Sequence, residues 1–410
     1  MKKDVQIAVV GKVFKPNRLK VLALNGTLNE YFSLVKWHLS FKSTSKTFLH
    51  RNGYEEAKRG FDLNTALIQT ARDKAVETLK SFEEHRKKDR VLNLKKSSIR
   101  FDKRCYGFSK TINILTPYWL TLSLNRRARI SLPIVFGERQ RGRIEEALQG
   151  KWKFTVVEMV KRDSEWYAHF VLGKTVEFTD EPETVIAVDR GEKNFSVAVA
   201  ILKDKPNKLM KGQFWNGAEI KRIRGLYSHV RRKLQKKKLL KKIKVVGRKE
   251  KRKVNQQLHI MANQVVEYAK QFPNPIMAME NLKGIRRSFK KSKKINRCFH
   301  SLPFRKLQTY IDYKANIEGI ETRYLTRKET RNTSKECHRC GYVTRKLRGR
   351  TYGCPNCGME YDRDLNAAIN IAHRVMNSMG WRSCEPLEPA GDARTQRRKG
   401  RLNAESPLLQ

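Results

Sequence analysis

Apolar and polar residues alternate along two tracts in the first half of the chain, and this pattern predicts β-strands. The first tract is 4–14. Between the tracts, apolar side chains recur every three or four residues from Leu67 to Phe82, which predicts a helix capped by Asn64. The two tracts could close one barrel around a helical insert. The strands expected in the second tract are 111–115, 119–124, 129–135, 154–160 and 166–172.

The pattern changes after the acidic turn at 180–183, where we expect a domain boundary. Two apolar strands follow at 185–189 and 195–201, joined by a tight turn. A third apolar strand is expected at 275–279, and an amphipathic helix at 364–377. The chain is therefore expected to be a multidomain α+β protein, with the β-barrel first and an α/β domain after it.

Positive charge dominates the composition. Of 410 residues, 89 are Lys or Arg and 40 are Asp or Glu, which gives a formal net charge of +49. This balance argues against a small-molecule enzyme and favours nucleic acid as the partner. The hydrophobic content of 39% can bury real cores, which excludes a wholly disordered basic protein. No apolar stretch is long enough to cross a membrane, so we expect a soluble intracellular protein.

The densest charge lies at 221–253, where seventeen of thirty-three residues are Lys or Arg and Glu250 is the only acid. Apolar residues recur through this stretch and predict a helix. Many such runs are solvated helical faces, but like charges four residues apart repel unless neutralised, so this density favours phosphate contact. The candidate nucleic-acid-binding residues here are Arg222, Arg224, Arg231, Arg232, Lys236, Lys237, Lys241, Arg248 and Arg252.

Four of the seven cysteines form two Cys-x-x-Cys pairs, Cys337 with Cys340 and Cys354 with Cys357. Thirteen residues separate the pairs, a spacer slightly shorter than is typical, and a glycine follows each pair. Two such pairs can present four thiolates to one zinc ion in tetrahedral geometry. A closed set of this kind leaves no open coordination position, so the expected zinc is structural.

Three acids stand at the ends of expected elements. Asp189 and Glu280 end apolar strands, and Asp364 begins a helix. Such carboxylates are costly to bury unless solvated or bound to a cation, and three that converge could hold two Mg²⁺ ions for phosphodiester hydrolysis. Taken alone, Asp189 also fits a turn residue and Asp364 a helix cap. Asp362, expected in the preceding turn, competes with Asp364 for the third position, and we prefer Asp364 because the packed helix carries it.

Four segments resemble the transposon-encoded TnpB (OrfB) family, relatives of the compact type V CRISPR effectors. They read IAVDRGEKN at 186–194, MENLKGI at 279–285, TSKECHRCG at 333–341 and YDRDLNAAINI at 361–371. In order and spacing they are similar to the split RuvC nuclease motifs of that family, with a zinc ribbon before the last motif. Arg190 is a mild departure, because the family more commonly has an uncharged residue after the first acid.

The resemblance implies an RNA-guided, Mg²⁺-dependent DNA endonuclease with an RNase H-like (RuvC) domain. It assigns catalysis and magnesium to Asp189, Glu280 and Asp364, and zinc to the four paired cysteines. It also implies a guide RNA, target double-stranded DNA, a short recognised duplex motif, a monomer or homodimer on RNA, and the cytoplasm or nucleoid of a prokaryotic cell. Candidates for gripping the scissile phosphate are Arg345, Arg348 and Arg350, which equally fit solvated loop charges.

The resemblance and the patterns together divide the chain into expected parts. These are a wedge-like, nucleic-acid-binding barrel at 1–20 and 95–180, a helical recognition insert at 21–94, a RuvC-like domain at 181–330 with a basic helical insert at 215–272, a zinc ribbon at 331–360, a last RuvC-like segment at 361–380 and a mobile basic tail at 381–410.

Alternatives of other classes stay open. A compact type V CRISPR effector would share these features, and a non-cleaving RNA-guided regulator would be expected to lack an acid of the triad. A transposase or Holliday-junction resolvase also uses RNase H-like carboxylates, but neither needs a four-cysteine ribbon between the second and third acids.

Overall fold

The computed structural model describes residues 2–84, 92–94, 98–112, 116–125, 128–191, 194–205, 212–281, 302–344, 347 and 349–381. The chain divides into two compact units. The N-terminal unit is Asp4–Thr175, and the C-terminal unit combines Met1–Lys3 with Val176–Gln410. The tail expected at 381–410 lies outside the described residues from residue 382 onward.

A seven-stranded sheet forms the centre of the N-terminal unit. Its order is β2-β6-β7-β1-β5-β4-β3. Because β2 and β3 are the two ends of this order, the pairings of the described strands do not close on themselves, and the barrel stays a prediction. The strands are β1 (Lys2–Val13), β2 (Ile99–Asp102), β3 (Tyr106–Lys110), β4 (Tyr118–Ser123), β5 (Arg129–Val135), β6 (Lys153–Arg162) and β7 (Glu165–Glu177).

Two predictions within this sheet need correction. The strand expected at 111–115 is wrong in its described part: Thr111 and Ile112 are not in a strand, and β3 ends before them at Lys110. Residues 113–115 lie outside the described part of the chain. A helix that the alternation did not predict, α4 (Glu138–Leu148), stands between β5 and β6 and buries Ile144 and Ala147.

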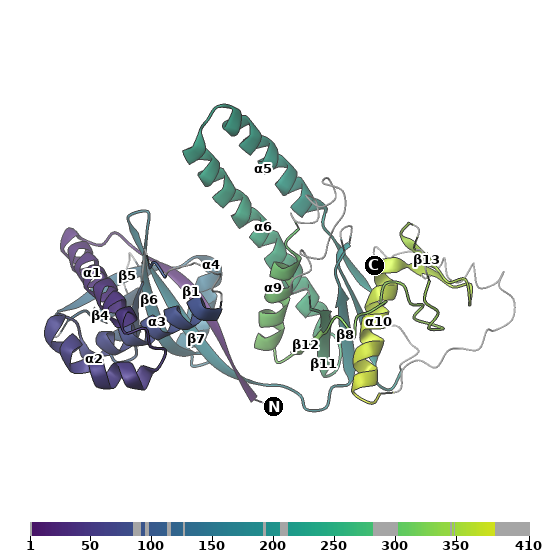
Figure 1. Ribbon diagram of the computed structural model, residues 1–410, viewed down its shortest axis with the longest axis horizontal. Helices are drawn as coiled ribbons and strands as arrows, with labels where there is room; N and C mark the ends of the chain where they lie inside the picture. Colours follow the sequence, from purple (N-terminus) through teal and green to yellow (C-terminus); the bar gives the residue numbers. More distant parts are fainter. Residues whose placement is uncertain are drawn as a thin grey trace. The chain divides into compact units, whose positions relative to one another are not determined.

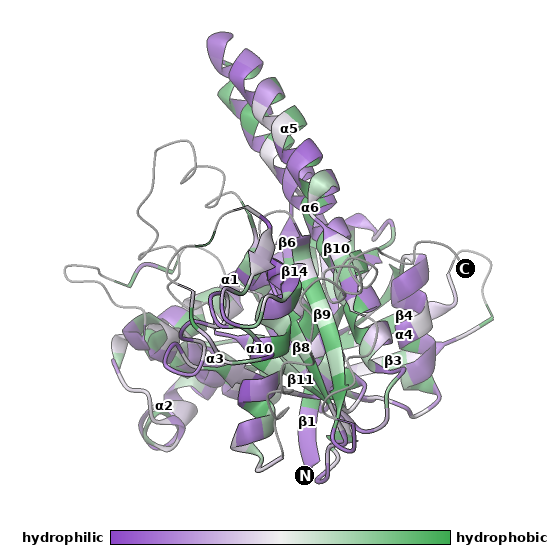
Figure 2. Ribbon diagram, turned by 90° about the vertical axis from the view of Figure 1, so that its right-hand side faces the viewer, coloured by the Kyte–Doolittle hydropathy of each residue, from purple (hydrophilic) through white to green (hydrophobic). Residues whose placement is uncertain are grey.

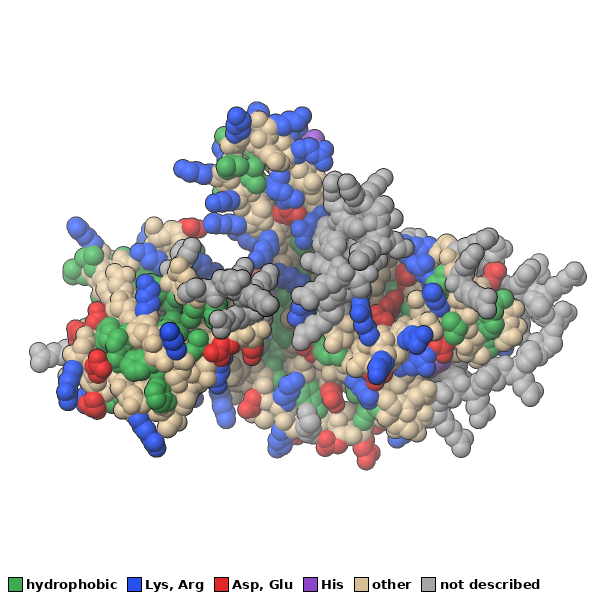
Figure 3. Space-filling view, viewed as in Figure 1, with side chains coloured by type: hydrophobic (Ala, Val, Ile, Leu, Met, Phe, Trp, Pro, Cys, Tyr) green, Lys and Arg blue, Asp and Glu red, His purple; other side chains and the backbone are tan. Residues whose placement is uncertain are grey.

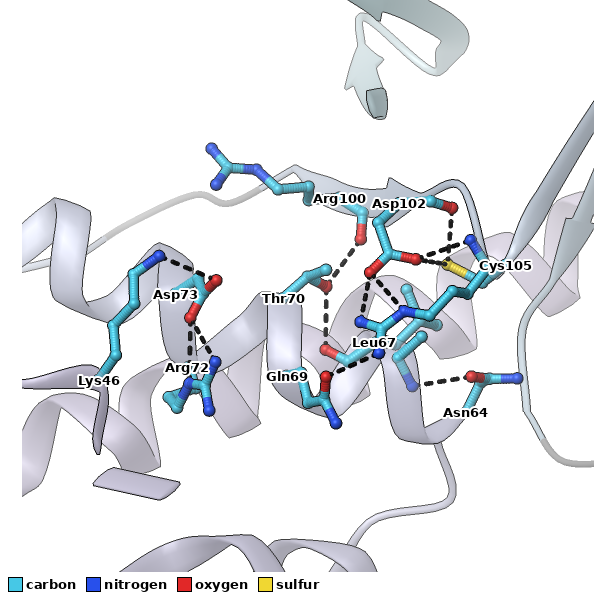
Figure 4. Close-up of polar contacts among 12 residues, drawn as sticks. Lys46, Asn64, Leu67, Gln69, Thr70, Arg72, Asp73, Arg100, Asp102 and Cys105 are labelled. Carbon is cyan, nitrogen blue, oxygen red and sulfur yellow. Dashed lines mark hydrogen bonds and ion pairs between the residues drawn. The ribbon is translucent and has the colours of Figure 1, made fainter. Parts of the chain in front are cut away.

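Three helices lie between β1 and β2 in the chain: α1 (Arg18–Ser40), α2 (Lys46–Gly60) and α3 (Thr65–Glu84). The helix predicted from the apolar repeat is confirmed as α3, and the Asn64 side chain accepts the N–H of Ala66 at 2.9 Å as the expected cap. Figure 4 shows how α3 lies against β2, where the Thr70 hydroxyl donates to the Arg100 carbonyl at 2.8 Å. This bond and the buried face of α3 hold the helices to the sheet.

The C-terminal unit is built on a mixed five-stranded sheet of order β10-β9-β8-β11-β12. Neighbours on the β9 side of β8 are antiparallel, whereas β8, β11 and β12 run parallel. The strands are β8 (Thr184–Asp189), β9 (Asn194–Leu202), β10 (Gln213–Asn216), β11 (Pro275–Glu280) and β12 (Glu321–Leu325).

Helices cover both faces of this sheet. Along β8, Ile186 and Val188 belong to a core shared with α6 (Leu240–Ala269) and α9 (Phe304–Ile317). The alternate residues Val185 and Ala187 belong to a second core shared with α10 (Arg363–Ser378). The continuous apolar run of β8 follows from burial on both faces, and Figure 2 shows the hydrophobic colour along β8 and β9.

The basic stretch at 221–253 is helical, as its pattern predicts, and it lies in two helices. Helix α5 (Ala218–Lys236) and helix α6 run antiparallel as a hairpin, which we call the arm (Figure 1). The break falls at Lys238, whose φ of 54° is in the left-handed region that ends a helix. In the part of the chain that the structure describes, no helix is long and apolar enough to span a membrane.

Candidate functional site

Two of the three predicted acids lie at the ends of neighbouring strands of the central sheet. Asp189 is the last residue of β8, and Glu280 is the last residue of β11. These strands are parallel neighbours with Val188 opposite Met279, one residue before the acids. The carboxyl ends of neighbouring parallel strands meet at one sheet edge, which is where open α/β sheets place their ligands.

The third acid, Asp364, reaches the same edge from the first turn of α10. It is 6% exposed, and the Asn194 amide donates to its Oδ2 at 3.0 Å. Gly191 lies so close that an added Cβ would be 3.4 Å from that oxygen and 3.0 Å from the Asn194 carbonyl. The turn between β8 and β9 therefore holds the third carboxylate near the first, and we call the three acids the acid cluster.

The three carboxylates of the acid cluster are costly to ionise together. Burial and the nearby charges of Glu280 and Asp364 raise the pKa of Asp189 to about 7. Burial also raises the pKa of Glu280, and burial together with Asp362 raises the pKa of Asp364. Carboxylate oxygens are the ligands that Mg²⁺ prefers, so the donor set fits a divalent cation. Its charge would stabilise the three carboxylates in their ionised form.

The positively charged side chain of Arg190 lies beside the acid cluster. Its Nη2 donates to the Glu280 carbonyl at 2.6 Å, and Gln308 donates to the same oxygen at 3.1 Å. The Nε and Nη1 atoms of Arg190 are buried and have no hydrogen-bond partner in the described part of the chain. Burial lowers the pKa of Arg190, while Glu280 and Asp189 oppose that shift. The residue that departs from the family pattern thus ties the ends of β8 and β11 together.

Sequence reasoning missed two residues that orient the carboxylates. Asn194 donates to Asp364, as described above, and the hydroxyl of Thr333 lies 3.4 Å from Glu280 Oε1, to which it donates. Both lie within the conspicuous motif segments, Asn194 at the end of the first and Thr333 at the start of the third. A polar residue at the end of a motif, pointing at an acid far away in sequence, gives no periodic signal.

Asp362 has a role of its own at the start of α10. It is the last residue of β14 (Glu360–Asp362), not a turn residue as expected, and it caps the helix. Its Oδ1 accepts the N–H groups of Asp364 at 2.9 Å and Leu365 at 3.0 Å. The alternative in which Asp364 is the cap is therefore wrong.

The four paired cysteines meet in one cluster. The Sγ atoms of Cys337 and Cys357 are 3.7 Å apart, those of Cys340 and Cys354 are 3.5 Å apart, and all four lie within 4.8 Å of one another. A tetrahedral zinc ion with bonds of about 2.3 Å separates its sulfurs by roughly 3.8 Å, so the cluster could bind zinc. Among the described residues, the three acids do not form so tight a group.

Both cysteine pairs share one backbone geometry. Gly341 has a φ of 73° and Gly358 a φ of 66°, and each donates its N–H to the carbonyl of the first cysteine of its pair at 2.9 and 3.0 Å. Only glycine adopts such angles without strain. Tyr352 of β13 (Thr351–Gly353) is fully buried beside the sulfurs and bonds to the Lys335 and Tyr342 carbonyls through its hydroxyl.

Helix α10 connects the two clusters. Asn366 donates to the Glu336 carbonyl at 2.8 Å and accepts the His338 backbone N–H at 3.2 Å. One turn later, Asn370 donates to the same carbonyl at 2.7 Å and to the Thr333 carbonyl at 2.8 Å. The helix that carries Asp364 is therefore bonded to the chain that enters the cysteine cluster.

The basic candidates differ in their surroundings. Arg222 pairs with Glu219, whereas Arg224 and Arg231 both pair with Glu250. Arg350 lies 3.7 Å from Asp364 Oδ2, and Arg345 and Arg348 lie outside the described residues. Figure 3 shows basic side chains in blue over the arm. The exposed candidates on the arm are Arg222, Arg232, Lys236, Lys237, Lys241, Arg248 and Arg252.

These observations define a mixed α/β protein with an acid cluster at a sheet edge and a four-cysteine cluster bonded to the same helix. Residues 304–371, which span α9, the cysteine cluster and Asp364, match the family model of the Cas12f1-like TNB domain. The TnpB-like protein MJ0751 of Methanocaldococcus jannaschii is 30% identical over 266 residues, or 63% of this chain and 91% of that protein. The chain belongs to the TnpB family.

Two further comparisons place the chain near compact type V effectors. The CRISPR-associated endodeoxyribonuclease Cas12f2 of Micrarchaeota archaeon is 28% identical over 239 residues, which are 52% of this chain and 41% of that protein. Among solved structures, the Cas12f1–sgRNA–target DNA complex superposes with a TM-score of 0.65 and 16% identity, covering 86% of this chain and 82% of that one. The second likeness shows a shared fold.

Proposed function

We propose that the chain is an RNA-guided, Mg²⁺-dependent DNA endonuclease, associated with a transposon, that cuts target DNA next to a short recognised duplex motif. The convergence of Asp189, Glu280 and Asp364 at one edge of the sheet, in a member of the TnpB family, carries this proposal. The relatives named as endodeoxyribonucleases, and the related fold solved with sgRNA and target DNA, support it.

The three acids would hold the Mg²⁺ ions through their carboxylate oxygens. When bound, the ions supply an activated water and stabilise the leaving oxygen of the phosphodiester. The protein's own residues set the geometry: Asn194 fixes Asp364, Thr333 fixes Glu280, and Arg190 fixes the end of β11. We assign this RuvC-like, RNase H-like site to 181–330 and 361–380.

The remaining parts serve binding and support. A zinc ion on Cys337, Cys340, Cys354 and Cys357 would be structural, because the four thiols fill its coordination sphere. The net charge of +49 and the exposed cations of the arm would hold the backbones of guide RNA and target double-stranded DNA. The barrel and helical insert would hold duplex and heteroduplex.

The decisive experiment identifies the RNA that co-purifies with the protein. We expect a discrete RNA and, after its sequencing, Mg²⁺-dependent cutting of a DNA duplex that matches it. Removal of the RNA should abolish sequence-specific cutting. RNA-free protein that still cuts a defined sequence would instead identify a transposase or resolvase, and guided binding without cutting would identify a regulator.

A further inference from the structure

The base of the arm gathers cations around one buried core. Ile223 of α5, Val254 of α6 and Leu307 of α9 belong to the same buried cluster. Arg224 follows Ile223, Lys251 lies one turn before Val254, and Lys306 precedes Leu307. The three helices share this core, and the charges of Arg224 and Lys251 act on Lys306, so the three cations lie near one another; we call them the cation cluster.

The charges at this junction do not balance. Glu250, 3% exposed, accepts Arg224 Nη1 at 3.0 Å and also pairs with Arg231. This one carboxylate faces two guanidinium groups, and Lys251 and Lys306 add two further positive charges. The five side chains together carry a surplus of three positive charges.

Arg224 and Lys306 are in unfavourable surroundings at this positively charged junction. Arg224 Nε is buried and has no hydrogen-bond partner among the residues that the structure describes, although the other end of the guanidinium is paired. Burial lowers the pKa of Lys306, and the charges of Lys251 and Arg224 lower it further. A buried donor without an acceptor and like charges held together are both relieved when an anion binds.

Lys306 is held in place by an aromatic stack. Its Nζ lies 5.7 Å from the centroid of the Tyr310 ring, in the arrangement of a cation–π contact. The His259 ring of α6 stacks on Tyr310 with centroids 3.9 Å apart and planes 11° apart. The stack therefore holds the ammonium group of Lys306 in place without a bound ligand.

We propose that Arg224, Lys251 and Lys306 bind one phosphate group of a nucleic-acid backbone. The inference rests on the proposed function, which brings guide RNA and target DNA to the protein. A phosphate offers several acceptor oxygens to a guanidinium and two ammonium groups converging from different helices. Glu250 fixes Arg224 and Arg231 to α6 and, as a fixed anion, moderates the charge of the site.

The test compares two lysines of the same helix. Lys306→Gln removes a charge from the cation cluster, whereas Lys314→Gln removes the same charge two turns away, where Lys314 donates to Asn263 at 2.6 Å. Affinity is measured across a salt series with the labelled co-purifying RNA and, separately, with a labelled DNA duplex. The probe whose affinity responds tells which backbone occupies the site.

For that probe we expect Lys306→Gln to weaken binding about fivefold and to reduce the slope of log K against log salt by about 0.7 for single-stranded RNA or 0.9 for duplex DNA. Lys306→Arg should restore both values, and Lys314→Gln should change the slope by less than about 0.2. Glu250→Gln, which removes the competing charge, should steepen the slope. Thermal unfolding checks that each variant is folded.

If Lys306→Gln fails to fold, Lys251→Gln at the exposed member of the cation cluster gives the same readout. Folded variants whose slopes match the wild type for both probes would overturn the phosphate site while leaving the proposed function intact. A wild-type protein that binds neither probe would instead refute the proposed function.

Discussion

We propose a metal for both the acid cluster and the cysteine cluster, and the two clusters differ in how their side chains are held. The cysteine cluster takes its four thiols from twenty-one consecutive residues, and two similar turns set their spacing. The acid cluster takes its carboxylates from the ends of β8 and β11 and from α10, far apart in sequence. Four thiols would fill the coordination sphere of a zinc ion and leave it a structural role, whereas three carboxylates would leave room on a Mg²⁺ ion for water and substrate.

The largest effect should follow from removing an acid. We expect Asp189→Ala, Glu280→Ala or Asp364→Ala each to lower the rate of DNA cutting by about three orders of magnitude or more, while binding changes little, because phosphate contacts supply the affinity. Single-turnover cleavage and filter binding measure the two properties.

The matched control for this series is Asp362→Ala. It removes the α10 cap and should cost about 1 kcal/mol of stability, with a much smaller loss of cutting. If Asp362→Ala abolishes cutting and Asp364→Ala does not, the third metal ligand is Asp362.

Loss of the zinc should have the next largest effect. We expect about one zinc per chain, and we expect Cys354→Ser or chelation to unfold the segment 337–357 and to lower cutting about tenfold, because the site folds around its metal. Elemental analysis and cleavage assays check this. Full activity in a metal-free cysteine variant, with Mg²⁺ restored, would show that the two clusters are independent.

A smaller change isolates the link between the clusters. Asn366→Leu removes the hydrogen bonds of this side chain to the Glu336 carbonyl and the His338 N–H, but it leaves the bond from Asn370 to that carbonyl and touches no sulfur or acid. Cutting should fall several-fold and zinc content should stay at one per chain, because two buried hydrogen bonds are lost but no metal ligand is. Unchanged cutting would mean that α10 is held sufficiently by its apolar face.

The smallest effect on activity is expected far from both clusters in sequence, at His38 of α1. This side chain is 2% exposed, and neither ring nitrogen has a hydrogen-bond partner among the described residues. Burial, with a contribution from Arg72, lowers its pKa from 6.5 to about 4. The unfolded chain therefore takes up the proton first, so stability is complete above pH 6.5 and falls by about 3 kcal/mol as the pH drops to 4.

His38→Phe should flatten this dependence and leave cutting at pH 7 unchanged. Urea unfolding at several pH values measures it. An equally steep fall of stability in the variant would assign the pH dependence to other groups.

The local features of the molecule could be predicted, and those that join distant segments could not. The spacing of the cysteines and the apolar run of β8 are visible in short windows, which is why the cysteine cluster and the position of Asp189 were expected. Glu250 was read as an isolated acid in a basic run, because its partner Arg224 lies 26 residues away on another helix. The break at Lys238 has no glycine or proline to mark it, so the helical pattern did not show where α5 ends and α6 begins.

The N-terminus of α10 has an electrostatic consequence for the acid that it carries. The unpaired N–H groups of a helix start act as about half a positive charge, which favours a nearby anion by about 0.3–1 kcal/mol. Asp364 lies in that first turn, with the Asp362 cap fixing the direction of the helix axis. The macrodipole therefore offsets part of the cost of burying an ionised Asp364, a compensation that a strand end does not give to Asp189 or Glu280.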